Sequence, residues 1–398
     1  RRGGAPRRSP ATRVQPLRTE ARRDRYASGA ESMRTSRGAS AESSGLCARG
    51  LRIVSAPCSS LEGVSTRLSL VGTHPLAQSQ ALLRAGMSFG DQVHEALEAL
   101  GTTKPHPWFE DLSAVQLVEV AGAAHQLRVA RERIEVTSRR KITGVFYTPL
   151  ALAERLVEDV LNQQPAAALG GRRFLDPCAG TGSFVFAFLR VAVRRLGTVS
   201  SSQREDYVRA LTSSVHAADI DDEAIMVYRA LLPRFVASEL HVEVDPSECV
   251  RNSRIGDSLS FEGSLGALSA TSAADLFPGV DSGFDWVVTN PPYGLIKPDR
   301  RRVGDNRDHS ELLSADRFAA FAKRDAGFTW ARQGSLNWYK LFAEAIVKRF
   351  AATNSSVGLL VPVTLLSDQQ TSRLRQGLLN SGEVGMVRVI PEQNEYFP

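Results

Sequence analysis

The sequence has little cysteine and no long apolar run, and each shortage excludes a class of protein. Only four cysteines occur, and they lack the paired spacing of a metal site: Cys47, Cys58, Cys178 and Cys249. We therefore expect reduced thiols, no bound metal and a cytoplasmic location. No stretch approaches the ~18 apolar residues of a membrane-spanning helix, so we expect no membrane partner.

The rest of the composition is that of a globular chain with a basic balance. Of 398 residues, 42% are hydrophobic and 23% are charged, and the net charge is +6. Much of the positive charge lies in residues 1–80, which are rich in Arg and Ser, so we expect a disordered arm there. The net charge permits a polyanionic partner but does not require one.

The start of the chain raises a separate question, because the first residue is Arg rather than Met. We hypothesise that the natural start lies further along, with Met33 and Met87 as candidate initiators. An Arg- and Ser-rich start is also typical of an organellar transit peptide. After the arm, we expect a helical connector over 81–140 and an α/β domain over 141–398.

Helices and strands alternate through the second of these regions. Helical periodicity covers 81–100, 112–136, 152–160, 184–191, 225–232, 338–350 and 372–379. Strand-like segments end at 176 and 255, and others cover 215–220, 286–289, 357–361 and 387–390. This alternation predicts a doubly wound, mostly parallel α/β sheet, with ligands in the crevice at the carboxyl ends of the strands.

A glycine-rich turn, FLDPCAGTGSF, joins the first of these strands to a helix. Gly180 and Gly182 allow a sharp turn and a close approach of the backbone to a ligand. Asp176 stands at the strand tip before them, where a carboxylate suits ribose hydroxyls or an ammonium group. No lysine follows the second glycine, so the phosphate-binding loop of nucleotide triphosphatases is excluded.

Two more acidic residues follow later strands, Asp219 in AADIDDEAI and Asp257 in IGDSL. In nucleotide-binding sheets, a carboxylate at such a strand end accepts hydrogen bonds from ribose hydroxyls. Acidic residues also cap helices, which is a purely structural role. We expect Asp221 or Asp222 to cap the next helix and Asp219 to bind a ligand.

The stretch TNPPYG, residues 289–294, ends an apolar strand. Two consecutive prolines cannot donate to a sheet ladder, so the strand must stop there. The simpler interpretation is a strand terminator with an Asn-led turn. The alternative is a rigid platform that presents the Asn290 amide, the Pro291 carbonyl and the exposed ring of Tyr293 to a planar ligand.

Five motifs occur in order: GVFYTP (144–149), DPCAGTGSF (176–184), ADID (218–221), GDSL (256–259) and NPPYG (290–294). Together they resemble the adenine-N6 DNA methyltransferases, and most closely the branch found in restriction–modification systems, including enzymes that fuse methylase and nuclease. The resemblance runs from about residue 141 to the end. It implies the class I S-adenosylmethionine-dependent methyltransferase fold and a catalytic domain over 141–398.

The resemblance implies S-adenosylmethionine as the cofactor. The residues it assigns to the donor are Tyr147, Thr148, Pro149, Asp176, Ala179, Gly180, Gly182, Asp219, Ile220 and Asp257. Residues 147–149 would cover the methionine end, and residues 176–182 would line the methionine and the ribose. Asp219 would hold the ribose hydroxyls, Ile220 would pack against the adenine ring, and Asp257 would accept from its amine.

The resemblance also assigns catalysis to Asn290, Pro291, Pro292 and Tyr293. An exocyclic adenine amine is a poor nucleophile because its lone pair is delocalised into the ring. The Asn290 side-chain oxygen and the Pro291 carbonyl would accept its two hydrogens and direct the lone pair at the donor methyl. The prolines would hold these acceptors in place, and Tyr293 would stack on the flipped base.

Double-stranded DNA is the partner that the resemblance implies. The segment 297–332 is polar and basic, with Arg300, Arg301, Arg302, Arg307 and Lys323, and is expected as a mobile loop over DNA phosphates or as a solvated insertion. The chain ends where similar enzymes continue into a target-recognition domain, and no nuclease motif precedes residue 144. We therefore expect a truncated core that works with a recognition domain, a specificity subunit or a nuclease subunit.

Two other functions remain open. The NPPY tetrapeptide also occurs in methyltransferases of RNA guanine-N2 and of protein glutamine, although GVFYTP favours DNA adenine. The third possibility is a non-catalytic module that binds S-adenosylmethionine and DNA without transferring a methyl group.

Overall fold

The structure is a computed structural model, and it describes residues 112–135, 146–162, 164–263, 266–296, 308–325 and 327–390. The expected arm over 1–80 and the expected helix over 81–100 lie outside these described residues. The division into arm, connector and α/β domain therefore stays a prediction. The helix expected over 112–136 is confirmed as α3 (Ala114–Glu135).

Five parallel strands form the central sheet, in the order β3-β2-β1-β6-β7. Their bounds are β1 (Phe174–Asp176), β2 (Val215–Asp219), β3 (Ser253–Ile255), β6 (Phe284–Thr289) and β7 (Ala351–Leu359). The chain runs outward from β1 to β3 on one side and from β6 to β7 on the other. The strand order therefore reverses between β1 and β6, which leaves a crevice at their carboxyl ends. The predicted doubly wound, mostly parallel α/β fold is confirmed.

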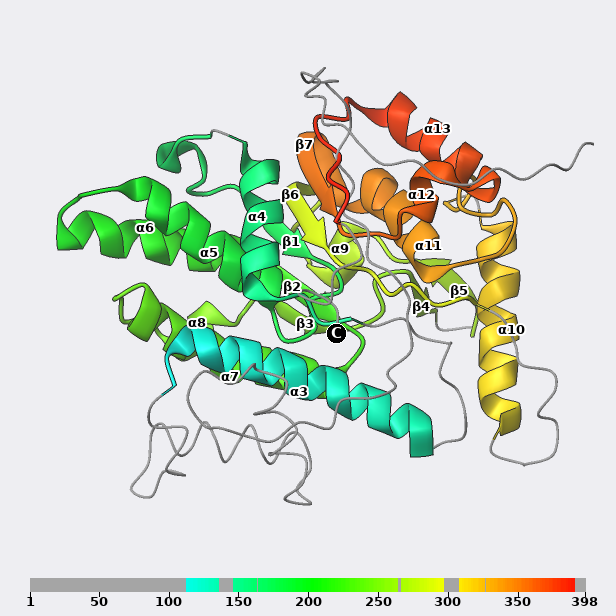
Figure 1. Ribbon diagram of the computed structural model, residues 1–398, viewed down its shortest axis with the longest axis horizontal. Coiled ribbons are helices and arrows are strands. Elements are labelled where there is room, and N and C mark those ends of the chain that lie inside the picture. The colour runs from blue at the N-terminus through cyan, green and yellow to red at the C-terminus, as the bar shows by residue number, and fades with distance from the viewer. Residues whose placement is uncertain are drawn as a thin grey trace, which may run out of the picture. The chain divides into compact units, whose positions relative to one another are not determined.

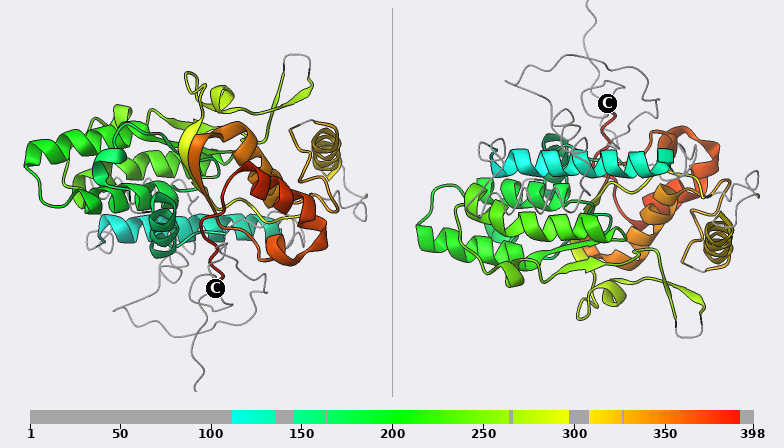
Figure 2. Two further views of the ribbon diagram at one scale, coloured as in Figure 1. Left: turned by 90° about the horizontal axis from the view of Figure 1, so that it is seen from above. Right: turned by 90° about the horizontal axis from the view of Figure 1, so that it is seen from below.

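Helices cover both faces of the sheet (Figures 1 and 2). One group consists of α3, α4 (Leu150–Leu161), α5 (Ser183–Leu196), α6 (Ser201–Ser214), α7 (Asp222–Glu239) and α8 (Pro246–Cys249). The opposite face carries α9 (Ala273–Leu276), α10 (Asp308–Arg324) and α11 (Trp338–Ala345). Behind α11 lie α12 (Thr364–Ser367) and α13 (Ser372–Ser381), which share a small third cluster with it.

The alternation of side chains along the strands explains this division. Phe174 and Trp286 point into the cluster with α4 and α5, whereas Leu175 and Val287 point into the cluster with α10 and α11. A shift of register between Phe284 and Trp286 interrupts the alternation in β6. Because of it, Phe284 faces the second cluster although it lies two residues from Trp286.

The expected basic loop over 297–332 is wrong over residues 308–324, which form α10, whereas the described residues after this helix, up to 332, are turns and coil. Phe318 and Ala322 lie one helical turn apart and are both buried. The Phe318 ring centroid lies 4.8 Å from that of Trp338 on α11, so packing turns this polar segment into a helix. The expected DNA-contacting Arg300, Arg301, Arg302 and Arg307 lie outside the described residues.

The last expected strand, over 387–390, is also wrong. The structure has a single bridge residue at Val387 there. Side chains hold this segment instead, because Arg388 donates to both carboxylate oxygens of Asp159 on α4, at 2.8 and 2.9 Å. The helix expected over 338–350 is α11 followed by a π-helical turn, η3 (Ile346–Phe350).

The elements that were not predicted include the short helices α8, α9 and α12, the longer helix α6, and the antiparallel hairpin of β4 (Ser260–Glu262) and β5 (Leu268–Ala270). A local signal for α6 was present in the sequence, since Ser200 and Gln203 form a capping box at its start. The hairpin strands are three residues long each, which is too short for a clear alternating pattern.

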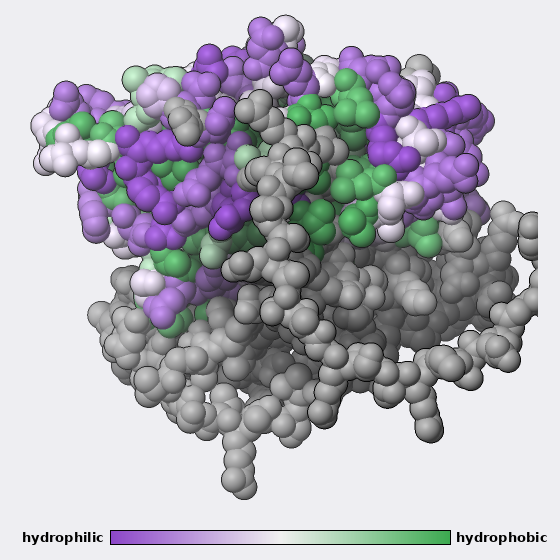
Figure 3. All heavy atoms as spheres, turned by 45° about the horizontal axis from the view of Figure 1, so that its top comes forward, coloured by the Kyte–Doolittle hydropathy of each residue, from purple (hydrophilic) through white to green (hydrophobic). Residues whose placement is uncertain are grey.

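The surface of the described residues carries some exposed apolar side chains. Figure 3 shows a mostly hydrophilic face on which hydrophobic residues come to the surface in several places. Exposed apolar side chains include Ile220, Phe261 and Leu379. Within the described ranges, no helix is long and apolar enough to cross a membrane.

Candidate functional site

A cavity of about 580 Å³ lies at the carboxyl ends of the strands, within the size range of cofactor sites. The predicted site residues that line it are Tyr147, Thr148, Ala179, Gly180, Asp219, Ile220, Asp257, Asn290 and Pro292. Those that do not are Pro149, Asp176, Gly182, Pro291 and Tyr293. The structure thus brings residues of all five motifs to one place, while the role of each residue stays a prediction.

The glycine-rich turn after β1 is held by the acid at the end of β2. Asp219 accepts hydrogen bonds from the Gly180 backbone N–H (2.8 Å) and the Asp221 N–H (2.9 Å). Burial raises the pKa of the Asp219 carboxyl, an effect that these two hydrogen bonds oppose. A carboxylate can accept about four hydrogen bonds, so two bonds to the backbone leave capacity for two ligand hydroxyls.

Gly182 supports this turn from below rather than facing the cavity. Its φ is 99°, and a Cβ atom there would lie 2.4 Å from the Tyr228 ring. Only glycine combines that backbone conformation with such a close contact. The expected capping role of Asp221 is confirmed, because its side chain accepts from the Ala224 N–H at 3.1 Å and begins α7.

Asp176 lies beneath the turn, at 1% exposure. One carboxylate oxygen accepts from the Cys178 N–H at 3.1 Å, whereas the other has no hydrogen-bond partner among the described residues. Burial raises the pKa of Asp176 to about 7. The hydroxyl of Thr289, at the end of the neighbouring β6, is also buried and lies near enough to Asp176 to lower its pKa. Within the described chain, however, neither this hydroxyl nor the second Asp176 oxygen has a partner at hydrogen-bonding distance.

Asp257 and Ile220 form the side of the cavity at the ends of β2 and β3. Asp257 accepts from the Leu259 N–H (2.8 Å) and from the Ser260 hydroxyl (2.9 Å), and burial raises its pKa. Ile220 is 72% exposed although it is strongly apolar. An apolar surface beside a hydrogen-bonding acid is the arrangement that a planar heterocycle with an amine would fit.

Asn290 is the residue with the most defined orientation at the site. Its side-chain nitrogen donates to the Phe146 carbonyl (3.0 Å) and to the Thr148 hydroxyl (3.0 Å). A carbonyl can only accept, so the nitrogen must face Phe146, and the amide cannot be flipped. Its oxygen is therefore fixed on the other side, buried and without a hydrogen-bond partner in the described part of the chain.

Tyr293 lies differently from the exposed tyrosine that the sequence suggested. It is half-buried, its hydroxyl donates to the Leu360 carbonyl at 3.1 Å, and its ring centroid lies 5.4 Å from that of Phe146. Trp338 and Phe342 of α11 are among the aromatic residues that line the cavity, with Phe146, Tyr147 and Phe184. Sequence reasoning did not assign Trp338 and Phe342 to the site, although their i, i+4 spacing places both on one helix face.

The N-terminal helix α3 forms a further wall of the cavity that sequence reasoning missed. Gly122, His125, Gln126 and Val129 contribute to it. Nε2 of His125 lies 2.9 Å from a carboxylate oxygen of Asp221, which joins α3 to the start of α7. The sequence did contain one indication of this contact: Gly122 lies inside a helical pattern, and such a glycine can mark the close approach of another element.

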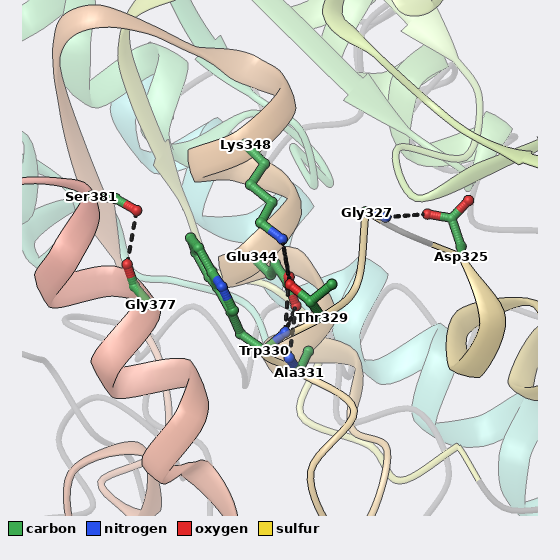
Figure 4. Close-up of polar contacts among 9 residues, drawn as sticks. All are labelled: Asp325, Gly327, Thr329, Trp330, Ala331, Glu344, Lys348, Gly377 and Ser381. Atoms are coloured by element: carbon green, nitrogen blue, oxygen red, sulfur yellow. Dashed lines mark hydrogen bonds and ion pairs between the residues drawn. The ribbon is translucent and has the colours of Figure 1, made fainter. Parts of the chain in front are cut away.

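A second buried polar cluster lies behind α11 (Figure 4). Glu344 is fully buried and accepts from the Thr329 hydroxyl, the Trp330 and Ala331 N–H groups and the Lys348 ammonium. These bonds fix the segment before α11 and thereby the helix that carries Trp338. Asn337 precedes α11, and its side-chain oxygen is buried and unpaired within the described residues.

No family model matches the chain, and no curated protein does either. The chain is similar in structure to a nuclease-deletion mutant of the Type ISP restriction-modification enzyme LlaGI in complex with a DNA substrate mimic. The identity is 18% over 77% of this chain and 26% of that one, and the TM-score is 0.41. It is also similar to a type I restriction-modification system methyltransferase subunit from Streptococcus thermophilus, at 15% identity over 77% and 59% of the two chains and a TM-score of 0.36.

A third similar structure is described as a modification subunit of a type I restriction enzyme from Vibrio vulnificus, at 17% identity over 67% and 44% of the two chains, with a TM-score of 0.36. The chain spans less than two thirds of the length of each of these three proteins. Likeness at this distance does not assign an activity, so the function must be inferred from the site itself.

Proposed function

We propose that this chain is the catalytic core of an adenine-N6 DNA methyltransferase that uses S-adenosylmethionine, in a restriction–modification or phage-defence system. The observation that carries the proposal is the fixed, buried amide oxygen of Asn290. A buried acceptor without a partner is costly, so a site that keeps one is suited to a ligand that donates a hydrogen there.

The residues around the cavity fit S-adenosylmethionine. Asp219 retains capacity for ribose hydroxyls, and Asp257 can accept from the adenine amine beside the exposed face of Ile220. The unpaired oxygen of Asp176 lies below the glycine turn, and an ammonium group of a methionine moiety placed there would favour the ionised form of this carboxyl. When bound, this donor supplies an electrophilic methyl group.

The chain's own contribution to transfer is to prepare the acceptor amine. The Asn290 oxygen accepts one hydrogen of the amine, and the Pro291 carbonyl accepts the other, so that its lone pair is less delocalised into the ring. The Thr148 and Phe146 contacts hold the Asn290 oxygen before the substrate arrives, which avoids a cost of reorientation during reaction. Trp338 and Phe342 offer apolar surface at the same cavity.

DNA as the substrate follows from the order of the five motifs and is part of the proposal. A base must leave the duplex to reach a cavity of this kind. Sequence recognition would come from a recognition domain, a specificity subunit or a nuclease-bearing partner, as the resemblance implies.

A second candidate is a methyltransferase of RNA guanine-N2 or of protein glutamine. One specific observation favours it: the Asn290 acceptor would serve any planar amine or amide nitrogen, including those two. A binding-only module would use the same donor contacts without transfer.

One experiment separates these outcomes. The full chain is incubated with isotope-labelled S-adenosylmethionine and unmethylated DNA, with RNA and cell protein in parallel, and the digests are analysed by mass spectrometry. Label in N6-methyladenine supports the proposal, whereas label in RNA or protein alone supports the second candidate. Donor binding without any label identifies a binding module.

A further inference from the structure

The orientation of Asn290 depends on residues far from it in sequence. Both of its amide hydrogens are taken by the segment 146–148, which lies 142 to 144 residues earlier. Thr148 is buried, and its hydroxyl is one of the two acceptors. If this segment moved, the amide could rotate and present its nitrogen instead of its oxygen to the cavity.

The segment 146–150 is itself held by α3. One carboxylate oxygen of Glu119 accepts from the Tyr147 hydroxyl at 2.5 Å, and the other accepts from the Leu150 N–H at 2.6 Å. The Gln126 side chain accepts from the Tyr147 N–H at 3.0 Å. The second Glu119 contact also satisfies a free N–H at the start of α4, for which that helix has no side-chain cap of its own.

Helix α3 packs so closely against this segment that Gly122 has no room for a side chain. A Cβ atom at Gly122 would lie 1.8 Å from the Tyr147 ring. The ring therefore rests directly on the helix backbone, and its hydroxyl reaches Glu119 one turn away. Glu119 does not line the cavity, so any effect it has on a ligand is transmitted through Tyr147 and Leu150.

We propose that Glu119 and Thr148 are positioning residues that hold the Asn290 amide with its oxygen toward the acceptor nitrogen. The expected consequence, faster methyl transfer, rests on the proposed function. The orientation of the amide does not depend on that function. According to this proposal, helix α3 helps to position the catalytic amide and is more than a connector. Glu119 sets the segment, Thr148 sets the amide, and Asn290 contacts the substrate.

The test compares variants of the full chain by two independent readouts. Thr148→Val removes the hydroxyl but keeps the shape of the side chain. Thr148→Ser keeps the hydroxyl and removes only the methyl group. Glu119→Ala removes both contacts, and Glu119→Gln retains one acceptor. Glu154→Gln is the matched control, since Glu154 is a half-buried glutamate that pairs with Arg190 and Arg194, away from the cavity.

The first readout is hydrogen exchange of the Asn290 side-chain amide by NMR, with its signal identified by its loss in Asn290→Ala. We expect exchange to accelerate at least tenfold in Thr148→Val and Glu119→Ala, less in Glu119→Gln, and to stay within twofold of wild type in Thr148→Ser and the control. The second readout is the single-turnover rate of transfer to DNA, together with the Kd for the donor. We expect the rate to fall at least tenfold in Thr148→Val and Glu119→Ala, while the Kd changes less than threefold in Glu119→Ala, because Glu119 does not line the cavity.

Wild-type exchange and rates in both variants would overturn the inference, as would a Kd that rises in step with the loss of rate in Glu119→Ala. If Glu119→Ala does not fold, the Thr148 pair decides the matter. If the wild-type chain transfers nothing to DNA, the proposed function fails, while the amide exchange still supports or overturns the positioning of Asn290 by itself.

Discussion

Two buried polar clusters flank α11, and they differ in how completely they are hydrogen-bonded. Around Glu344, both carboxylate oxygens are satisfied, and the neighbouring Lys340 donates to the Gln333 and Ser335 carbonyls. Among the residues described, the unpaired atoms near it belong to Asn337 and Arg349, not to the Glu344 carboxylate. At the strand ends, Asp176, Thr289 and Asn290 each keep one polar atom that is unpaired within the described residues.

The difference separates a structural cluster from a binding site. A satisfied buried network stabilises one conformation, whereas an unsatisfied buried atom lowers stability until something pairs with it. Removing a group from the first cluster should therefore cost stability, and removing one from the second should cost activity or binding. Four substitutions test this contrast.

The largest effect is expected for Asn290→Ala in the strand-end cluster. Transfer should fall by a factor of about 1,000 or more, because the acceptor that prepares the amine is lost. Donor affinity should stay within about threefold of the wild-type value. The melting temperature should stay within a few degrees of it. Transfer of label to DNA and calorimetric donor binding measure the two effects. Asn252→Ala, whose amide bonds the Ser213 carbonyl elsewhere, is the matched control; an active Asn290→Ala protein would contradict the assignment.

Glu344→Ala tests the satisfied cluster. It leaves the Lys348 ammonium and two backbone N–H groups without their acceptor, so we expect a loss of about 3–5 kcal/mol in the free energy of unfolding. Denaturant titration measures it, with the exposed Glu383→Ala as control. If the variant kept wild-type stability but lost donor binding, the contrast between the clusters would be wrong.

Asp176→Asn tests whether burial at the strand ends costs stability. With its pKa raised to about 7 from 3.8, folded Asp176 holds a proton that the unfolded chain releases, so wild-type stability should fall as the pH rises between these values. Each pKa unit is worth about 1.4 kcal/mol, and the wild-type protein should lose roughly 3 kcal/mol relative to the variant between pH 4 and pH 8.

The measurement is unfolding of both proteins across that pH range. Buried His216, whose pKa is lowered to about 4, acts in the same range with the opposite sign, but it is present in both proteins and cancels in the difference. A difference that does not change with pH would show that the Asp176 pKa is not raised.

The smallest effect is expected for Ile220→Ala. The side chain is 72% exposed, so its loss should leave the melting temperature nearly unchanged. If a donor ring covers it, binding should weaken by about 1 kcal/mol, or about fivefold. Met226→Ala, half-exposed on α7 and away from the cavity, is the control. Equal donor affinities in all three proteins would remove Ile220 from the site.

Much of the fold was predictable because the signals are local. Strand-end acids, the glycine turn and the double proline each sit within a few residues of the element they end, and helix–strand alternation gives the parallel sheet. The failures were segments whose structure depends on distant packing. α10 exists because Phe318 packs on Trp338, and the segment 387–390 is held by Asp159 on α4.

The sequence by itself determined the α/β fold, the order of the motifs and the residues at the strand ends. The tertiary structure alone decided that Tyr293 packs on Phe146, that Trp338 and α3 line the cavity, and that the Asn290 nitrogen is held by the segment 146–148 while its oxygen is left unpaired within the described residues. The physical reason is distance along the chain. A turn or a cap is encoded by neighbours, whereas the partners of Asn290 lie more than 140 residues away, and only folding brings them to 3.0 Å.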